Sequence, residues 1–204
     1  MIAITNNYIK NNHRVRPGGS YNKVEICIHS TGNPESTAKN ERAWLDNPSN
    51  KRQASWHLCI DEKDCICAIP LKEEAWHCGN NNGNKYSIGI EICESGNRQK
   101  TLERAAELVV QLMKEYNIPL SKVKRHYDYS SKSCPAILMA NNWQGWKDFI
   151  KLIQNKMTTN DPYITAIDKL VSKGIINSPD IWKQETYNND NVKSLIVKFA
   201  NNVK

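Results

Sequence analysis

In the stretch Val24-Glu-Ile-Cys-Ile-His29, aliphatic residues alternate with Glu25, Cys27 and His29. Side chains two residues apart share one face of a β-strand, so the aliphatic residues face one way and His29 the other. Ser87-Ile-Gly-Ile-Glu-Ile-Cys93 repeats this pattern, with its isoleucines on one face and Glu91 on the other. Both stretches are therefore predicted to be strands, each with a chemically active side chain opposite its aliphatic face.

The residues around these strands predict helices and a hairpin. Apolar residues recur at helical spacing in three segments, and two short apolar runs flank a polar turn. An Asn- and Gly-rich stretch, 77–85, is predicted to be a loop. The predicted helices are 38–45, 102–116 and 143–153, and the further strands are 56–60, 65–70 and 123–126. The fold class that follows is α/β, with a central mixed β-sheet flanked by helices.

The last quarter of the chain has a different pattern. Residues 156–161 are polar and predict a linker between a main domain, 1–155, and a small all-α module, 162–204. Apolar residues at helical spacing predict three short helices in this module. Because so short a segment without a disulfide or metal makes a marginal core alone, we expect it to dock on the main domain or to self-associate.

Composition excludes several classes of protein. No apolar run approaches the roughly 20 residues that cross a bilayer, so no membrane insertion is expected. The first residues lack the basic start and apolar stretch of a secretory signal, which predicts synthesis in the cytoplasm. The net charge of +7 suits an acidic partner, either nucleic acid or an anionic cell wall. Since the charge is spread out and no nucleic-acid-binding motif is present, nucleic acid is not expected.

The chain has seven cysteines, and an odd number without an export signal predicts reduced thiols. Three are predicted to be small buried hydrophobes because they lie in apolar runs: Cys27, Cys59 and Cys93. Three others have a spacing that fits neither a zinc finger nor a redox pair: Cys65, Cys67 and Cys78.

His29, His126 and Cys134 form a candidate metal site. Each histidine ends a predicted strand, and Cys134 stands before a proline in a loop that can turn back toward them. Two imidazoles and one thiolate leave the fourth tetrahedral position of zinc free, which is the arrangement of a catalytic site. Taken singly, each residue is more often structural than a ligand, and no contact between His29 and the other two is visible in a sequence. The hypothesis is a zinc hydrolase.

Further residues are candidates for roles around such a metal. Glu91 interrupts an apolar strand and is either a general base or a solvated or ion-paired carboxylate. Gly89, on the same face, is expected to leave room for substrate. Lys132 is either a donor to an oxyanion or an ordinary solvated lysine. His77, at the start of the Asn- and Gly-rich stretch, is a candidate for the rim of the site.

Five motifs together resemble one family: Ile28-His29-Ser-Thr-Gly32, Ala54-Ser-Trp-His57, Ala75-Trp-His-Cys-Gly79, Ser87-Ile-Gly-Ile-Glu91, and Arg125-His126 through Lys132-Ser-Cys134-Pro135. In order, and over roughly residues 20–155, they are similar to the zinc-dependent N-acetylmuramoyl-L-alanine amidases of the peptidoglycan-recognition-protein-like fold. The likeness is greatest to the type 2 amidases that phages of Gram-positive, clostridial-type hosts use as endolysins.

The resemblance implies a peptidoglycan hydrolase that cleaves the amide bond between N-acetylmuramic acid and the L-alanine of the stem peptide by zinc-activated water. It implies one Zn²⁺ per chain, and it assigns roles to the candidate residues. The metal ligands would be His29, His126 and Cys134, the catalytic residues Glu91 and Lys132, and the substrate-binding residues His77 and Trp56. Some members of the family have Tyr in place of Trp56, and an indole cannot donate the phenol's proton, so Trp56 is assigned substrate packing and no acid–base role.

The implied partners are bacterial peptidoglycan and anionic wall polymers, and the enzyme would act on the cell wall after release from the cytoplasm. Residues 162–204 resemble, less closely, a short helical module that either binds the wall or oligomerises, and in the second case the chain would form a homo-oligomer through these helices. Two alternatives remain: a non-catalytic peptidoglycan-binding protein of the same fold, and a basic zinc protein that binds nucleic acid. The complete set of ligand and catalytic residues favours the enzyme.

Overall fold

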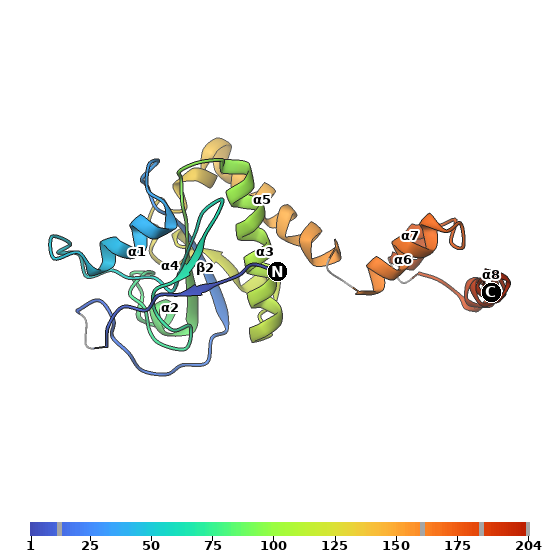
Figure 1. The fold of residues 1–204 in the computed structure, drawn as a ribbon, viewed down its shortest axis with the longest axis horizontal. Helices are drawn as coiled ribbons and strands as arrows, with labels where there is room; N and C mark the ends of the chain where they lie inside the picture. Colours follow the sequence, from blue (N-terminus) through green and yellow to red (C-terminus); the bar gives the residue numbers. More distant parts are fainter. Residues whose placement is uncertain (12–13, 160–161, 184–185, 203–204) are drawn as a thin grey trace. The chain divides into compact units, whose positions relative to one another are not determined.

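A mixed β-sheet lies at the centre of the N-terminal part of the chain (Figure 1). The computed structural model describes residues 1–11, 14–159, 162–183 and 186–202. These residues divide into two compact units, Met1–Ile153 and Gln154–Lys204. The sheet of the first unit has six described strands in the order β1-β4-β3-β5-β2-β6. Their bounds are β1 Thr5–Asn6, β2 Glu25–Ser30, β3 Leu58–Ile60, β4 Cys65–Cys67, β5 Ser87–Ile92 and β6 Val123–Arg125.

Strands β2 and β5 form the middle of the sheet. They pair in parallel with each other, and β3 and β6 extend the sheet in parallel on either side, while β3 and β4 form the predicted antiparallel hairpin. The isoleucines of β2 and β5 are fully buried, as predicted. Cys27 and His29, on the opposite face, are buried as well, which is usual for parallel strands covered on both faces. The α/β fold class with a central mixed sheet is confirmed.

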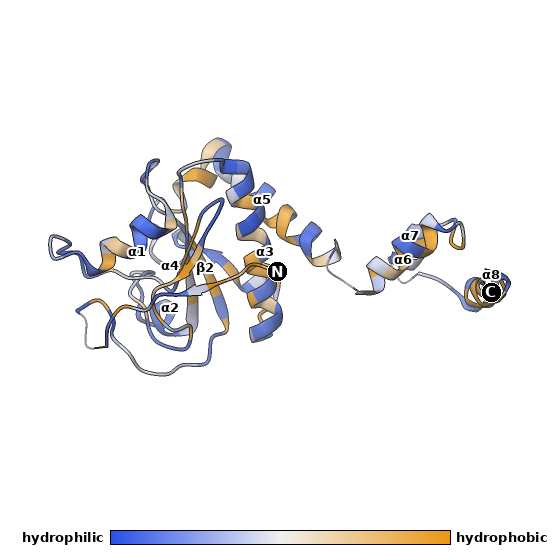
Figure 2. Ribbon diagram, viewed as in Figure 1, coloured by the Kyte–Doolittle hydropathy of each residue, from blue (hydrophilic) through white to orange (hydrophobic). Residues whose placement is uncertain are grey.

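The long helix α3, Arg98–Tyr116, contacts strands β3 and β5. Its buried stripe includes Leu108, Val109 and Leu112, so the predicted amphipathic helix is confirmed. The side chain of Asn97 caps its start by accepting from the backbone N–H of Lys100. Figure 2 shows both hydrophobic and hydrophilic residues along α3.

Two of the remaining helices of the first unit were not predicted, and a third extends beyond its predicted end. The bounds of the remaining helices are α1 Ala38–Asp46, α2 Asn81–Tyr86, α4 Tyr127–Ser130 and α5 Ala140–Thr159, with short 3-10 turns at Leu120–Lys122 and Ala136–Leu138. Helix α2 lies within the predicted loop 77–85, because the Asn80 side chain caps it. Helix α5 runs through residues 156–159 of the predicted linker, since polar residues alone do not end a helix; residues 160 and 161 lie outside the described residues.

The second unit contains the three predicted helices, α6 Pro162–Ser172, α7 Pro179–Lys183 and α8 Asn189–Asn202. Its small interior includes Ile167, Ile175 and Ile176, which are buried. The ring of Trp182 stacks on that of Tyr187 with centroids 4.8 Å apart. In the described parts of the chain, no helix is long and apolar enough to cross a membrane.

Candidate active site

The ends of neighbouring parallel strands bring the two predicted histidine ligands together. His29 is the last residue but one of β2, and His126 directly follows β6. The backbone N–H of His126 donates to the carbonyl oxygen of Ile28 at 3.1 Å, which continues the β2–β6 ladder by one residue. Parallel strands end at the same edge of a sheet, so the two imidazoles meet there although 97 positions separate them.

The third predicted ligand reaches the same point from a loop. Cys134 is tied back to the start of α4, because its carbonyl oxygen accepts from the N–H of Tyr127 at 3.0 Å. Its Sγ lies 3.8 Å from Nδ1 of His29, and Nδ1 of His29 lies 3.0 Å from Nδ1 of His126. All three side chains are buried, and their donor atoms lie within 4.8 Å of one another.

This donor set fits zinc. Two imidazole nitrogens and one sulfur are ligands that Zn²⁺ takes in tetrahedral sites, and three protein ligands leave one position open. Burial, with the positive charge of Lys132 adding, lowers the pKa of His126 to about 4, so its ring is neutral as a ligand must be. Burial likewise holds the pKa of His29 well below its usual value. Burial raises the pKa of Cys134 to about 11, so a bound cation must displace the thiol proton.

Glu91 stands beside the metal-ligand candidates. In the β2–β5 pairing its register partner is His29, so both side chains project from the same face of the sheet. Its Oε2 is buried and, within the described residues, makes no hydrogen bond. Burial, with repulsion from Glu41 adding, raises the pKa of Glu91 to about 8, while the positive charge of Lys132 opposes this rise. A carboxylate without a partner and with a raised pKa is suited to accept a proton.

A cleft of about 780 Å³ opens over these groups. Its lining includes the three ligand candidates, Glu91 and the exposed Lys132, so these residues lie around one cleft. Trp56 also lines the cleft, and its indole Nε1 is buried without a hydrogen-bond partner in the described structure. Two further tryptophans of the wall were not predicted, Trp44 and Trp76. Aromatic side chains at the wall of a polar cleft are suited to pack against a substrate.

His77 lines the cleft, but its side chain lies deeper than the rim position that the sequence predicted. His77 is only 7% exposed, and its Nδ1 lies 2.9 Å from Nε2 of His29, so the ring sits behind the ligand candidate. Gly89 explains this position, because a Cβ there would lie 2.7 Å from Nδ1 of His77. The space beside Glu91 that was expected to admit substrate is therefore filled by the His77 ring. A contact of His77 with substrate stays a prediction, since its side chain still lines the cleft.

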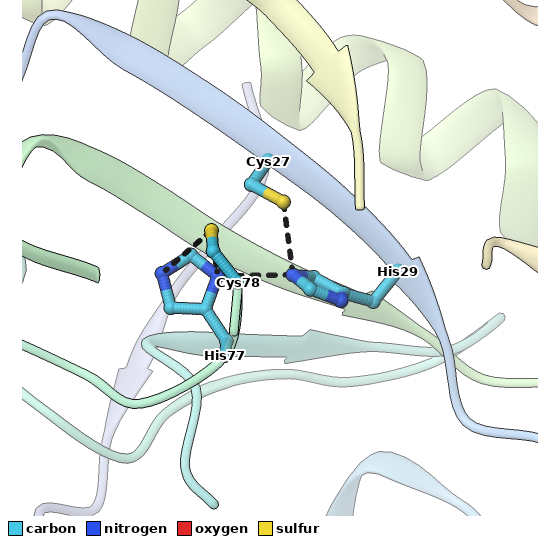
Figure 3. A group of neighbouring side chains, drawn as sticks. All are labelled: Cys27, His29, His77 and Cys78. Atoms are coloured by element: carbon cyan, nitrogen blue, oxygen red, sulfur yellow. Dashed lines mark hydrogen bonds between the residues drawn. The ribbon is translucent and has the colours of Figure 1, made fainter. Parts of the chain in front are cut away.

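Two cysteines near the site were missed by the sequence analysis. Cys27 lies 3.1 Å from Nε2 of His29, and the Sγ of Cys78 lies 3.2 Å from Nδ1 of His77 (Figure 3). Cys27 is buried as predicted, but its thiol is a polar neighbour of the site. A signal was present, because the alternation of β2 already put Cys27 and His29 on one face.

Two imidazoles and a thiol beside an unpartnered carboxylate, in an open cleft, are typical of a metal-dependent hydrolase. Comparison with known proteins agrees with that class. The family model described as N-acetylmuramoyl-L-alanine amidase matches residues 22–137. The N-acetylmuramoyl-L-alanine amidase CwlH of Bacillus subtilis is 32% identical over 193 residues, which cover 91% of this chain and 74% of that protein.

Solved structures give the same result. The catalytic domain of XlyA has a TM-score of 0.69 and 34% identity, covering 74% of this chain and 99% of that one. A mutant endolysin from Bacillus subtilis has a TM-score of 0.69 and 35% identity, covering 75% and 99%. Other relatives are longer, and the chain spans about half the length of the CwlA, BlyA and XlyA amidases of Bacillus. The chain belongs to the N-acetylmuramoyl-L-alanine amidase family.

Proposed function

We propose that this chain hydrolyses the amide bond between N-acetylmuramic acid and the L-alanine of the peptidoglycan stem peptide, with one zinc ion for catalysis. The observation that carries the proposal is the unpartnered carboxylate of Glu91 beside His29 in the open cleft. Zinc held by His29, His126 and Cys134 would supply a Lewis acid that polarises the amide carbonyl and makes water a better nucleophile.

The protein's own residues carry the proton transfers. Glu91 accepts the proton of the attacking water and passes it to the departing nitrogen of L-alanine. Because its pKa is raised, the same carboxyl group can serve first as base and then as acid. Lys132 lines the cleft, and its ammonium group stabilises the oxyanion that forms at the carbonyl. Trp56 packs against the substrate and takes no part in proton transfer.

The substrate and the place of action follow from the family. Peptidoglycan is the partner, and the chain acts on the cell wall after release from the cell. Helices α6–α8 serve as a small module that binds anionic wall polymer or a second copy of the chain. The exposed apolar residues Ile196, Val197 and Phe199 of α8 support this role, because such residues on one helix are commonly contact surfaces.

The decisive experiment uses purified Gram-positive cell walls, with and without a zinc chelator. We expect new L-alanine amino termini, no new reducing sugars, and loss of this product when the chelator is present. Reducing ends in place of amino termini would contradict cleavage of the amide. Tight wall binding with neither product would favour a non-catalytic binding protein of the same fold.

A second experiment tests the ligand assignment. Cys134→Ser removes the thiolate of the catalytic set, and we expect loss of both turnover and the catalytic zinc. The matched control is Cys59→Ser, at an equally buried cysteine outside the site whose Sγ lies 3.3 Å from that of Cys93. Unchanged zinc content in the Cys134 variant would contradict its role as a ligand.

A further inference from the structure

Four donor residues form a second group beside the proposed catalytic site: Cys27, His29, His77 and Cys78 (Figure 3). All four side chains are buried, and their donor atoms lie within 4.8 Å of one another. Nε2 of His29 lies 3.1 Å from the Sγ of Cys27 and 2.9 Å from Nδ1 of His77. The Sγ of Cys78 completes the group at 3.2 Å from Nδ1 of His77.

The two groups share the ring of His29 but use different atoms of it. Nδ1 faces His126 and Cys134, whereas Nε2 faces Cys27 and His77. When both ring nitrogens are deprotonated, Nδ1 and Nε2 each have one lone pair in the plane of the ring. An ion on one side therefore does not take the donor atom that an ion on the other side needs.

Two glycines open the space that this second group occupies. A Cβ at Gly89 would lie 2.7 Å from Nδ1 of His77, and one at Gly83 would lie 2.9 Å from the Sγ of Cys78. Gly89 is also the register partner of Cys27, so the missing side chain lies beside two members of the group, Cys27 and His77. Any other residue at either position would push a donor out of place.

We propose that Cys27, His29, His77 and Cys78 form a second zinc site, joined to the catalytic ion through the ring of His29. Two thiolates and two imidazoles are a donor set of closed, structural zinc sites, in contrast to the three ligands of the catalytic set. This inference adds a metal site to the proposed function and leaves the proposed catalytic residues and catalytic ligands in their roles, while His77 becomes a metal ligand in place of a substrate contact.

The geometry requires only a small expansion. Zinc–nitrogen bonds of about 2.0–2.1 Å and zinc–sulfur bonds of about 2.3 Å put tetrahedral donors roughly 3.3–3.8 Å apart. The three short contacts, of 2.9–3.2 Å, must therefore open by a few tenths of an ångström to admit the ion, and the other donor pairs lie within 4.8 Å.

The charges and protons balance. With Nδ1 of His29 on the catalytic ion, the remaining ring proton is on Nε2, and zinc displaces it together with the thiol protons of Cys27 and Cys78. Three protons leave for one Zn²⁺, which leaves the shared ring as an imidazolate between two cations. Proton release on metal binding is general for sites with thiol ligands.

Metal stoichiometry tests the inference on the full chain. After removal of metal and refilling, we expect two zinc ions per wild-type chain and one in Cys27→Ser and in Cys78→Ser. The matched control, Cys59→Ser, should keep two, and Cys134→Ser should keep the second ion alone. A wild-type chain that saturates at one ion, or a folded Cys78→Ser chain that keeps two, would overturn the inference.

A measurement on the wild-type chain covers the case in which the variants do not fold. Co²⁺ in place of zinc gives charge-transfer absorption from each thiolate ligand, so two filled sites should absorb about three times as strongly as the catalytic site alone. If a second equivalent of Co²⁺ adds no thiolate charge-transfer absorption, the inference of a second site is overturned. Failure of the proposed catalysis is distinguishable, because Glu91→Gln should lose turnover while it keeps both ions.

Discussion

Glu91 lies directly opposite His29 in the parallel pairing of β5 with β2. Neighbouring strands are about 4.8 Å apart, so the same backbone hydrogen bonds that hold the sheet also fix the distance between the carboxylate and the ligand ring. A register slip of one residue would turn one of the two side chains to the other face of the sheet. The alignment of proposed base and metal is therefore a property of the core and does not depend on a mobile loop.

Glu91→Gln should separate metal binding from turnover. The amide cannot accept the proton of water, so we expect release of L-alanine amino termini to fall by roughly 100- to 10,000-fold while zinc content is unchanged. Glu115→Gln, the same substitution on an exposed residue at the end of α3, is the control. An active Glu91→Gln enzyme would rule out the assignment of the base.

The same carboxyl makes the stability of the metal-free protein depend on pH. Burial raises the pKa of Glu91 to about 8, above the value of about 4.3 in an unfolded chain. The folded state then binds this proton more tightly, so stability is lost as pH rises from the unfolded value through the folded one. In urea unfolding of the chelator-treated proteins at pH 8, we expect the free energy of unfolding of Glu91→Gln to exceed that of wild type by on the order of a few kcal/mol. At about pH 4 the two values should be equal. A difference that does not change with pH would contradict the raised pKa.

Gly89→Ala should disturb the ring behind His29. The new Cβ would lie 2.7 Å from Nδ1 of His77, and overpacking of this kind costs about 1–3 kcal/mol. Removing the ring as well, in Gly89→Ala with His77→Ala, should cost less than the sum of the two single changes. Thermal or urea unfolding of the four proteins gives the comparison, and strict additivity would show that the two side chains do not collide.

Helix α8 offers a test of the second unit. Ile196 and Phe199 are 61% and 52% exposed, so replacing both with Ser removes contact surface without opening a core. We expect weaker binding to cell walls or loss of self-association, with turnover on soluble muropeptides unchanged. Light scattering and wall sedimentation measure the two properties. A variant that matches wild type in both would remove α8 from the proposed role.

The sheet, and the face on which the candidate site residues lie, could be predicted from the sequence for one physical reason. Alternation in 24–29 and 87–92 reports which face each side chain occupies, so His29 and Glu91 were placed correctly on the non-aliphatic face. The short helix α2 was not predicted, because Asn and Gly are poor helix formers and its cap, Asn80, is one of several asparagines there.

The surroundings of His29 depend on contacts that a single sequence does not report. The position of His77 is set by the missing side chain of Gly89, a residue of another segment. Cys27 and Cys78 each look like ordinary buried cysteines in the sequence, and only the pairing of β2 with β5 and the loop before α2 brings them together. The residues that surround His29 are therefore determined by tertiary packing, which the local sequence pattern does not report.

The separation of the ligands along the chain links the ion to folding. His29 stands 97 positions before His126 and 105 before Cys134, so the donors meet only after β6 has joined the edge of β2. Closing so long a loop is entropically costly and slow, and an ion that binds only the closed state stabilises it by mass action. Chelation should thus lower the free energy of unfolding along with turnover. The proposed catalytic ion would in this sense also fasten the edge strand β6 to β2.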